Sequence, residues 1–214
     1  MNLLFKIFIY LLATFISYTN GRAQTPGFSQ VKDIENFKKS LRDKHLSTKT
    51  IKSNFVQEKH LSYMKEKSVS KGTMIIKEGK KIRIDYTSPF SYLIVINGDK
   101  LFIKDGKKVT KINIGADKTF SNLNDILLRS MKGDFDGSKD FSISYLESKE
   151  EYLLELVPLN VKKGNFSKIS IYLNRSSLQV SDLNMQEVSG DLTKMKFANT
   201  EINTNIGDEV FVVR

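Results

Sequence analysis

The sequence predicts a mainly β (α+β) fold, in which a strongly curved antiparallel sheet of about eleven strands is lidded by helices. Short apolar segments, several of them alternating strictly with polar residues, follow one another from residue 50 to residue 198. Tight-turn dipeptides such as Asn97-Gly98 and Asp105-Gly106 separate these segments. Two further segments have the three-to-four-residue apolar spacing that is typical of amphipathic helices.

Residues 1–23 have the features of a cleavable secretion signal. Lys6 precedes an uncharged, mostly apolar run from Ile7 to Tyr18, and the small residues Gly21 and Ala23 follow at cleavage-site spacing. The run is too short to span a bilayer comfortably, which favours cleavage before Gln24 over retention as a membrane anchor. We therefore expect a single exported domain over residues 24–214.

The predicted elements of this domain begin with a helix. Val31, Ile34, Phe37 and Leu41 recur at helical spacing and define one apolar face. After a polar break, residues 50–61 form the first predicted strand. The remaining strands are expected at residues 72–77, 81–86, 92–96, 101–104, 109–114, 141–145, 152–157, 167–173, 178–187, 192–198 and 210–213.

The clearest of these strands is the one at residues 81–86. Ile82, Ile84 and Tyr86 alternate with Lys81, Arg83 and Asp85, which is the pattern of a sheet with one face in water. Sequential strands that are joined by tight turns pair as neighbours. A meander of this length either closes into a barrel or curls into a half-barrel, and its apolar inner face needs a cover.

A second helix is predicted between residues 121 and 133. Its apolar side carries Leu123, Ile126, Leu127 and Met131. Together with the first helix it is the available lid for the inner face of the sheet. The pattern leaves open whether the space between lid and sheet is packed solid or hollow.

The residues that usually carry chemistry are scarce. The chain has no Cys, so its stability depends on its core without disulfides. His45 and His60 are far apart and lack metal-ligand spacing, and Gly-x-Gly occurs nowhere. The acidic run from Asp134 to Asp140 lacks the Glu that would complete a calcium loop. We expect no enzyme activity, no cofactor and no metal.

The net charge of +10 is spread along the whole chain. Such a field favours approach to anionic surfaces, and it fits a well-solvated surface equally well. No basic and aromatic stripe or known nucleic-acid motif accompanies the charge, so we expect no nucleic-acid partner.

A series of short motifs identifies a family resemblance. Ile51, Phe55 and Gln57 have the spacing that opens LolA-type carriers, and further matches follow in order. They are Gly72, Arg83 to Pro89 with Tyr86, Ile96 to Leu101 with Gly98, Leu154 to Pro158 with Leu156, Asp182, Gly190 to Thr193, Phe197, Asn203, Ile206 and Phe211. Each motif consists of turn and core residues, and their order behind a signal segment carries the match. Over residues 30 to 214 the chain resembles the LolA family of periplasmic lipoprotein carriers.

This resemblance implies an incomplete antiparallel barrel lidded by helices. It also implies a monomeric shuttle that takes acylated lipoproteins from an inner-membrane lipoprotein-releasing ABC transporter and hands them to an outer-membrane lipoprotein acceptor. Leu123, Ile126, Leu127 and Met131 would form the lid, and Arg83 would latch it or contact a partner, with Lys77, Lys80 and Lys81 as competitors for that role. The expected wall of the lipid cavity consists of Phe55, Ile82, Ile84, Tyr86, Leu93, Val95, Ile171, Met185, Met195 and Phe197.

A carrier of this kind needs a dry apolar cavity and an exit, and no bond chemistry. Each buried methylene contributes about 0.8 kcal/mol, so a sheltered acyl chain gains on the order of 10 kcal/mol over an exposed one. Two other functions remain open from the sequence. One is a related carrier for another lipid or glycolipid, and the other is a basic interaction domain with a solid core that binds polyanions.

Overall fold

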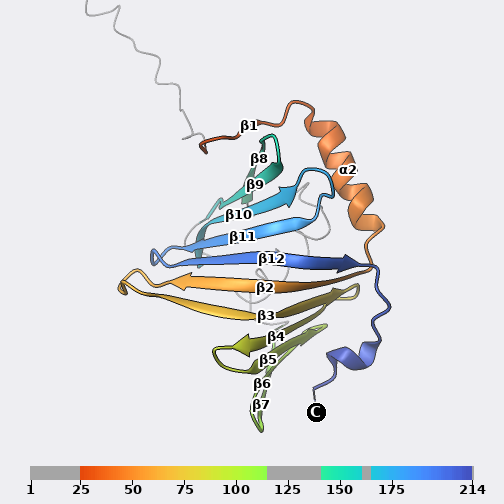
Figure 1. Cartoon of the computed structure of the whole chain (residues 1–214), viewed down its shortest axis with the longest axis vertical. Coiled ribbons are helices and arrows are strands. Elements are labelled where there is room, and N and C mark those ends of the chain that lie inside the picture. Colours follow the sequence, from red (N-terminus) through yellow and green to blue (C-terminus); the bar gives the residue numbers. More distant parts are fainter. Residues whose placement is uncertain (1–24, 115–140, 161–164, 214) are drawn as a thin grey trace, which may run out of the picture.

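The computed structural model describes residues 25–114, 141–160 and 165–213, and these residues form one antiparallel sheet of 12 strands (Figure 1). A helix, α2 (Ile34–Leu46), and a short 3₁₀ helix, η2 (Asp208–Phe211), accompany the sheet. The strands are β1 (Ser29–Gln30), β2 (Thr50–His60), β3 (Lys67–Lys77), β4 (Lys81–Ser88), β5 (Tyr92–Asn97), β6 (Lys100–Asp105), β7 (Lys108–Asn113), β8 (Phe141–Glu147), β9 (Glu151–Pro158), β10 (Phe166–Asn174), β11 (Val180–Glu187) and β12 (Leu192–Ile202).

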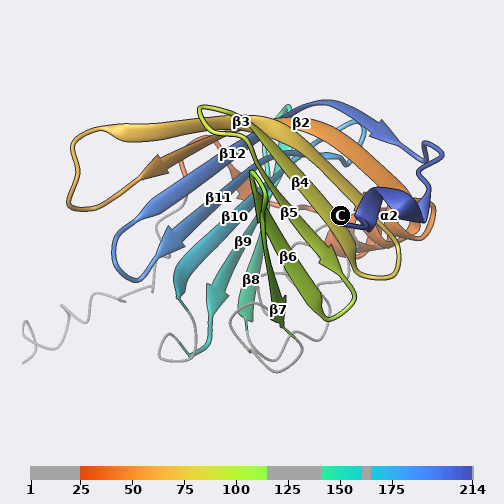
Figure 2. The same cartoon turned by 90° about the horizontal axis from the view of Figure 1, so that it is seen from below.

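The strand order is β1-β8-β9-β10-β11-β12-β2-β3-β4-β5-β6-β7. The sheet curves so that its central strands form the crown of an arch and its two ends turn down (Figure 2). The strands at its two ends, β1 and β7, do not pair with each other. The sheet is therefore open as well as curved, as expected. Its 12 strands replace the eleven or so predicted, and among the described residues one α-helix is present. The second predicted helix, with Leu123, Ile126, Leu127 and Met131, lies outside the described residues.

The two ends of the chain differ from the sequence prediction. The Val31 amide donates to the Tyr145 carbonyl oxygen at 3.1 Å, so the residues before the helix extend the sheet as β1. The helix therefore begins at Ile34, where the Asp33 carboxylate accepts from the Asn36 amide at 3.1 Å and caps the first turn. The strand predicted at 210–213 is wrong, because most of that segment belongs to η2 or follows it without pairing.

The concave face of the sheet carries the main apolar core. The register aligns Phe197 with Phe55, Phe55 with Gly72, and Gly72 with Tyr86, which places these side chains on one face across four strands. The Phe55 and Tyr86 rings meet edge to face with centroids 5.1 Å apart. A Cβ atom at Gly72 would overlap the Asp85 carbonyl oxygen and come within 2.8 Å of the Phe55 ring. The glycine therefore makes room for the ring.

The convex face at β3–β5 is covered by the C-terminal segment. Lys77 Nζ and Lys81 Nζ each lie 2.7 Å from a different carboxylate oxygen of Asp208, at the start of η2. These hydrogen bonds, with the one from Lys77 the strongest, lower the pKa of the Asp208 carboxyl to about 2. The two cations thus hold the beginning of η2 against the sheet.

Arg83 holds the other end of the same segment. Its guanidinium binds both carboxylate oxygens of Asp85, at 2.6 and 2.8 Å, and donates to the Val210 carbonyl oxygen at 2.9 Å. Phe211 is 1% exposed, and Val95, which is aligned with Arg83, is fully buried on the same face. Arg83 is therefore directed away from the concave face.

Candidate functional site

Helix α2 lies over one part of the concave face. Its buried residues are Phe37 and Leu41, which point toward the sheet. The Phe37 ring lies 4.3 Å from the Tyr152 ring and 6.1 Å from the Tyr145 ring, centroid to centroid. Lys38 Nζ lies 5.2 Å from the centroid of the same Tyr145 ring. Aromatic packing thus fixes the middle of the helix on β8 and β9.

The C-terminal end of α2 is tied to the chain that leaves β12. The Asn203 side chain donates to the Ser47 carbonyl oxygen and accepts from the Lys49 amide, both at 2.8 Å. The Thr48 hydroxyl donates to the Lys44 carbonyl oxygen at 2.7 Å. These bonds satisfy groups that a helix end leaves open, and they hold the last turn of α2 above the sheet.

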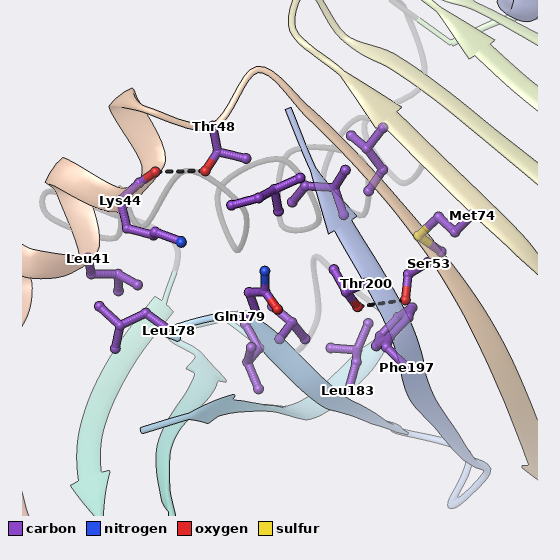
Figure 3. Close-up of a pocket in the computed structure, with 15 residues that line it drawn as sticks. Leu41, Lys44, Thr48, Ser53, Met74, Leu178, Gln179, Leu183, Phe197 and Thr200 are labelled. Carbon is purple, nitrogen blue, oxygen red and sulfur yellow. Dashed lines mark hydrogen bonds between the residues drawn. The ribbon is translucent and has the colours of Figure 1, made fainter. Parts of the chain in front are cut away.

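Between this last turn and the sheet lies a pocket with a cavity volume of about 80 Å³ (Figure 3). The helix contributes Leu41 and Lys44, and the strands β2, β3, β10, β11 and β12 contribute most of the floor and the far wall. The described lining consists of Leu41, Lys44, Thr48, Ile51, Ser53, Met74, Ile76, Ile171, Leu178, Gln179, Val180, Leu183, Phe197, Thr200 and Ile202.

The polar groups of the pocket fall into two sets. The Ser53 hydroxyl lies 2.9 Å from the Thr200 hydroxyl and donates to the Ala198 carbonyl oxygen at 3.0 Å, so the polar groups of the floor are paired. The Lys44 ammonium and the Gln179 amide, by contrast, both face the open space, one from the helix and the other from the side of the sheet (Figure 3). Lys44 is the one charged residue in the described lining.

Most of the predicted cavity wall lies on the concave face. Ile171 and Phe197 line the pocket itself. The others continue the apolar surface from it, and they belong to one core cluster or, for Ile84, pack against it: Phe55, Ile82, Ile84, Tyr86, Met185 and Met195.

The placement of Leu93 and Val95 on this wall is wrong. Leu93 is aligned with Asp85, and Val95 with Arg83, so both lie on the convex face. Their neighbours Ile94 and Ile96 take the concave positions and pack against the core.

Several pocket residues were not predicted as part of the wall. Leu41 was placed only on the apolar face of the first helix, and Lys44 and Gln179 were not singled out. Ile51, Met74 and Ile76 share the phase of Phe55 and Ile82, because Ile51 aligns with Ile76, and Ser53 with Met74. Alternation with a known register is the signal that would have found the strand residues.

The concave face also holds a buried phenol. Burial raises the pKa of the Tyr86 phenol, whose hydroxyl donates to the Gln57 side chain at 2.9 Å while its ring stacks on Tyr92 with centroids 4.2 Å apart. The phenol is therefore protonated at neutral pH. Across the described ranges, no group of three or more His, Cys, Asp or Glu side chains is arranged to hold a metal ion.

A family model decides the relationship of this chain to known proteins. The model described as outer membrane lipoprotein carrier protein LolA matches residues 46–214. The chain belongs to the LolA family. The match covers β2 to the C-terminal segment and therefore includes all the strands that line the pocket. No curated protein matches the chain.

Solved structures of similar shape include other members of the superfamily. A LolA superfamily protein from Nitrosomonas europaea is 11% identical, with 82% of this LolA-family chain and 97% of that chain covered, at a TM-score of 0.44. The lipoprotein LppX of Mycobacterium tuberculosis is 10% identical, with 80% of this chain and 96% of that chain covered, at a TM-score of 0.44. A chain from the MucA/MucB complex of Pseudomonas aeruginosa is 10% identical, with 85% of this chain and 62% of that chain covered, at a TM-score of 0.47. At these values we draw no functional conclusion from the individual structures.

No helix among the described residues has the length and apolarity to cross a membrane.

Proposed function

We propose that this protein is a non-enzymatic carrier that shelters acyl chains on the concave face of its sheet. The observation that carries the proposal is the continuous apolar face from Ile171 through Phe197 and Phe55 to Ile82, with α2 held over one part of it. Membership of the LolA family supports the same role. An apolar surface that is partly covered by a docked helix can bind hydrocarbon without any bond chemistry.

Binding requires the pocket to widen. Its cavity volume of about 80 Å³ lies well below the roughly 300–1,000 Å³ of sites that enclose drug-sized ligands. An acyl chain therefore enters by displacing the last turn of α2 from the sheet. Each methylene that it buries contributes about 0.8 kcal/mol, so a long chain can offset the free energy needed to move the helix. The Met side chains of the face, Met74, Met185 and Met195, adapt readily to different chain shapes.

The cargo and route belong to the same proposal. We infer that residues 1–23 direct export to the periplasm and are removed before Gln24. The cargo is the acylated end of lipoproteins, received from an inner-membrane lipoprotein-releasing ABC transporter and released to an outer-membrane lipoprotein acceptor. A carrier between two such partners works as a monomer, because its binding face must be presented to each of them in turn.

The test is native mass spectrometry of the protein purified without detergent from its own cell envelope. The proposal predicts a bound species whose mass corresponds to an acylated lipid or lipopeptide. Displacement of an uncharged fluorescent probe by an uncharged acyl chain such as methyl palmitate should also be independent of salt. Binding of polyanions that weakens steeply with salt, with no displacement by acyl chains, would favour the basic interaction domain instead.

The predicted lid gives a second test. Leu127→Asp should abolish lipoprotein capture in a pull-down while the far-UV circular dichroism spectrum is retained, because a buried carboxylate is incompatible with an apolar cover. Leu159→Asp is the matched control, since Leu159 is 65% exposed after β9. Equal capture by the wild-type protein and Leu127→Asp would show that this segment is not the cover.

A further inference from the structure

We propose that the pocket selects acyl chains with an anionic end, and that Lys44 binds this end. The inference rests on the proposed carrier function of the concave face. It concerns the alternative cargo of that function, a lipid other than the acylated end of a lipoprotein, and adds the chemical class of its polar group. It commits to an acyl lipid whose carboxylate or phosphate lies beside α2 while its hydrocarbon tail lies along the sheet.

The first support is the isolation of the Lys44 charge. Lys44 is half-buried at the last turn of α2, and it is the one ionisable side chain in the described lining. Within the described part of the chain no hydrogen bond or ion pair engages its ammonium, and no carboxylate lines the pocket beside it. A half-buried cation at an apolar wall, which no carboxylate of residues 25–114, 141–160 and 165–213 neutralises, can bind an anion.

The other lysines of the same helix are engaged differently. Lys39 forms an ion pair with Asp43 at 3.0 Å, and its side chain is 70% exposed. Lys38 lies over the Tyr145 ring. Lys44 is therefore distinguished by its position on the pocket and not by the general basicity of the chain.

The second support is the polarity gradient across the pocket. The Gln179 amide faces the same open space as the Lys44 ammonium and adds hydrogen-bond donors to it (Figure 3). Opposite them, Ile171, Leu183 and Phe197 form an apolar wall that leads on to the core surface. A ligand that satisfies both ends has an anionic head and a hydrocarbon tail, in this order from α2 to β12.

The apolar wall beside Lys44 increases the expected difference in affinity between charged and uncharged acyl chains. Water is partly excluded there, so a charge-assisted hydrogen bond contributes more than it does at an exposed lysine. A bond of this kind changes affinity by about tenfold or more. The same acyl chain with its charge removed should bind correspondingly more weakly.

The experiment compares palmitate with methyl palmitate, which share the chain and differ in charge. Each is titrated below its micelle concentration against the delipidated full-length mature protein loaded with an uncharged fluorescent probe, at pH 8. The wild-type protein should bind the acid about tenfold more tightly than the ester. In Lys44→Met this ratio should fall to about one, whereas Lys39→Met, which removes the same charge from the exposed side of the helix, should keep the wild-type ratio.

Each outcome decides a different point. A wild-type ratio near one, or an unchanged ratio in Lys44→Met, overturns the assignment of Lys44 while leaving a carrier of uncharged chains. Failure of both ligands to displace the probe from the wild-type protein overturns the carrier function itself. Circular dichroism of both variants establishes that the fold is retained. Replacing palmitate by hexadecyl phosphate and its neutral alcohol then separates recognition of a carboxylate from recognition of any anion.

Discussion

Truncation of Leu41 tests whether α2 is held on the sheet by its buried face. Leu41 is 4% exposed, lies in the core cluster and borders the pocket. Leu41→Ala removes three buried carbon groups, which amounts to about 2 kcal/mol of transfer free energy. Space left unfilled adds to this loss, and the adjoining cavity of about 80 Å³ shows that the walls do not collapse here. We expect a loss of about 3 kcal/mol in the free energy of unfolding.

The assay is urea denaturation followed by far-UV circular dichroism, with Ile34→Ala as the control. Ile34 lies in the first turn of the same helix and is 38% exposed, so its truncation should change the free energy of unfolding by less than about 1 kcal/mol. The midpoint should therefore fall clearly for Leu41→Ala and barely for the control. Equal losses in the two variants would refute the docking of this helix face on the sheet.

Two further predictions concern the sheet and its C-terminal cover. Gly72→Ala should lower the free energy of unfolding by about 3 kcal/mol or more, because the added methyl group would overlap a backbone carbonyl oxygen that can move only together with its strand. Gly79→Asn is the control. It lies at an open turn with positive φ, and it should leave the free energy of unfolding nearly unchanged in the same denaturation series. The carboxyl of Asp208 has its pKa lowered from 3.8 to about 2 in the folded protein, so its ion pairs contribute stability that is present above pH 4 and is lost as the pH falls through 2. The melting temperature of Asp208→Asn should therefore fall less steeply than that of the wild-type protein over this interval, and parallel pH profiles would contradict the assignment.

The sequence predicted the concave face best where one face of a strand meets water. In β4 the alternation of Ile82, Ile84 and Tyr86 with polar residues fixed the phase, and the register confirms it. The apolar residues that recur every three to four positions in the first helix also identified Phe37 and Leu41 correctly as its buried face. Period alone sufficed in both cases because burial differs between the two sides of the element.

The prediction failed where both faces of a strand are buried. In β5 the run from Tyr92 to Ile96 is apolar throughout, so its pattern carries no phase. The structure shows the reason, because the C-terminal segment with Phe211 covers the convex side of β4 and β5 and leaves Val95 fully buried. A contact made by residues more than a hundred positions away is invisible to a local pattern. The packing of Phe211 on β4 and β5 also involves the segment that was predicted as a strand at 210–213, whose first half belongs to η2.

The pocket itself depends on a long-range arrangement of the same kind. Asn203 holds the end of α2 through bonds to Ser47 and Lys49, some 150 positions earlier in the chain. This tie joins the end of the helix to the chain that leaves β12. Lys44 therefore becomes a site residue only in the folded chain, although its sequence context is that of an ordinary helical lysine.

Photolabelling with an acyl chain that carries a diazirine near its end tests the central claim most directly. After irradiation and proteolysis, mass spectrometry of the labelled peptides locates the tail. Labels should fall on the concave strands β10–β12 and β2, in peptides that contain Ile171, Leu183, Phe197 or Ile51, and excess unlabelled palmitate should prevent them. Labels confined to the convex face or to exposed turns such as that at Phe90, or labelling that palmitate does not reduce, would contradict an acyl-binding concave face.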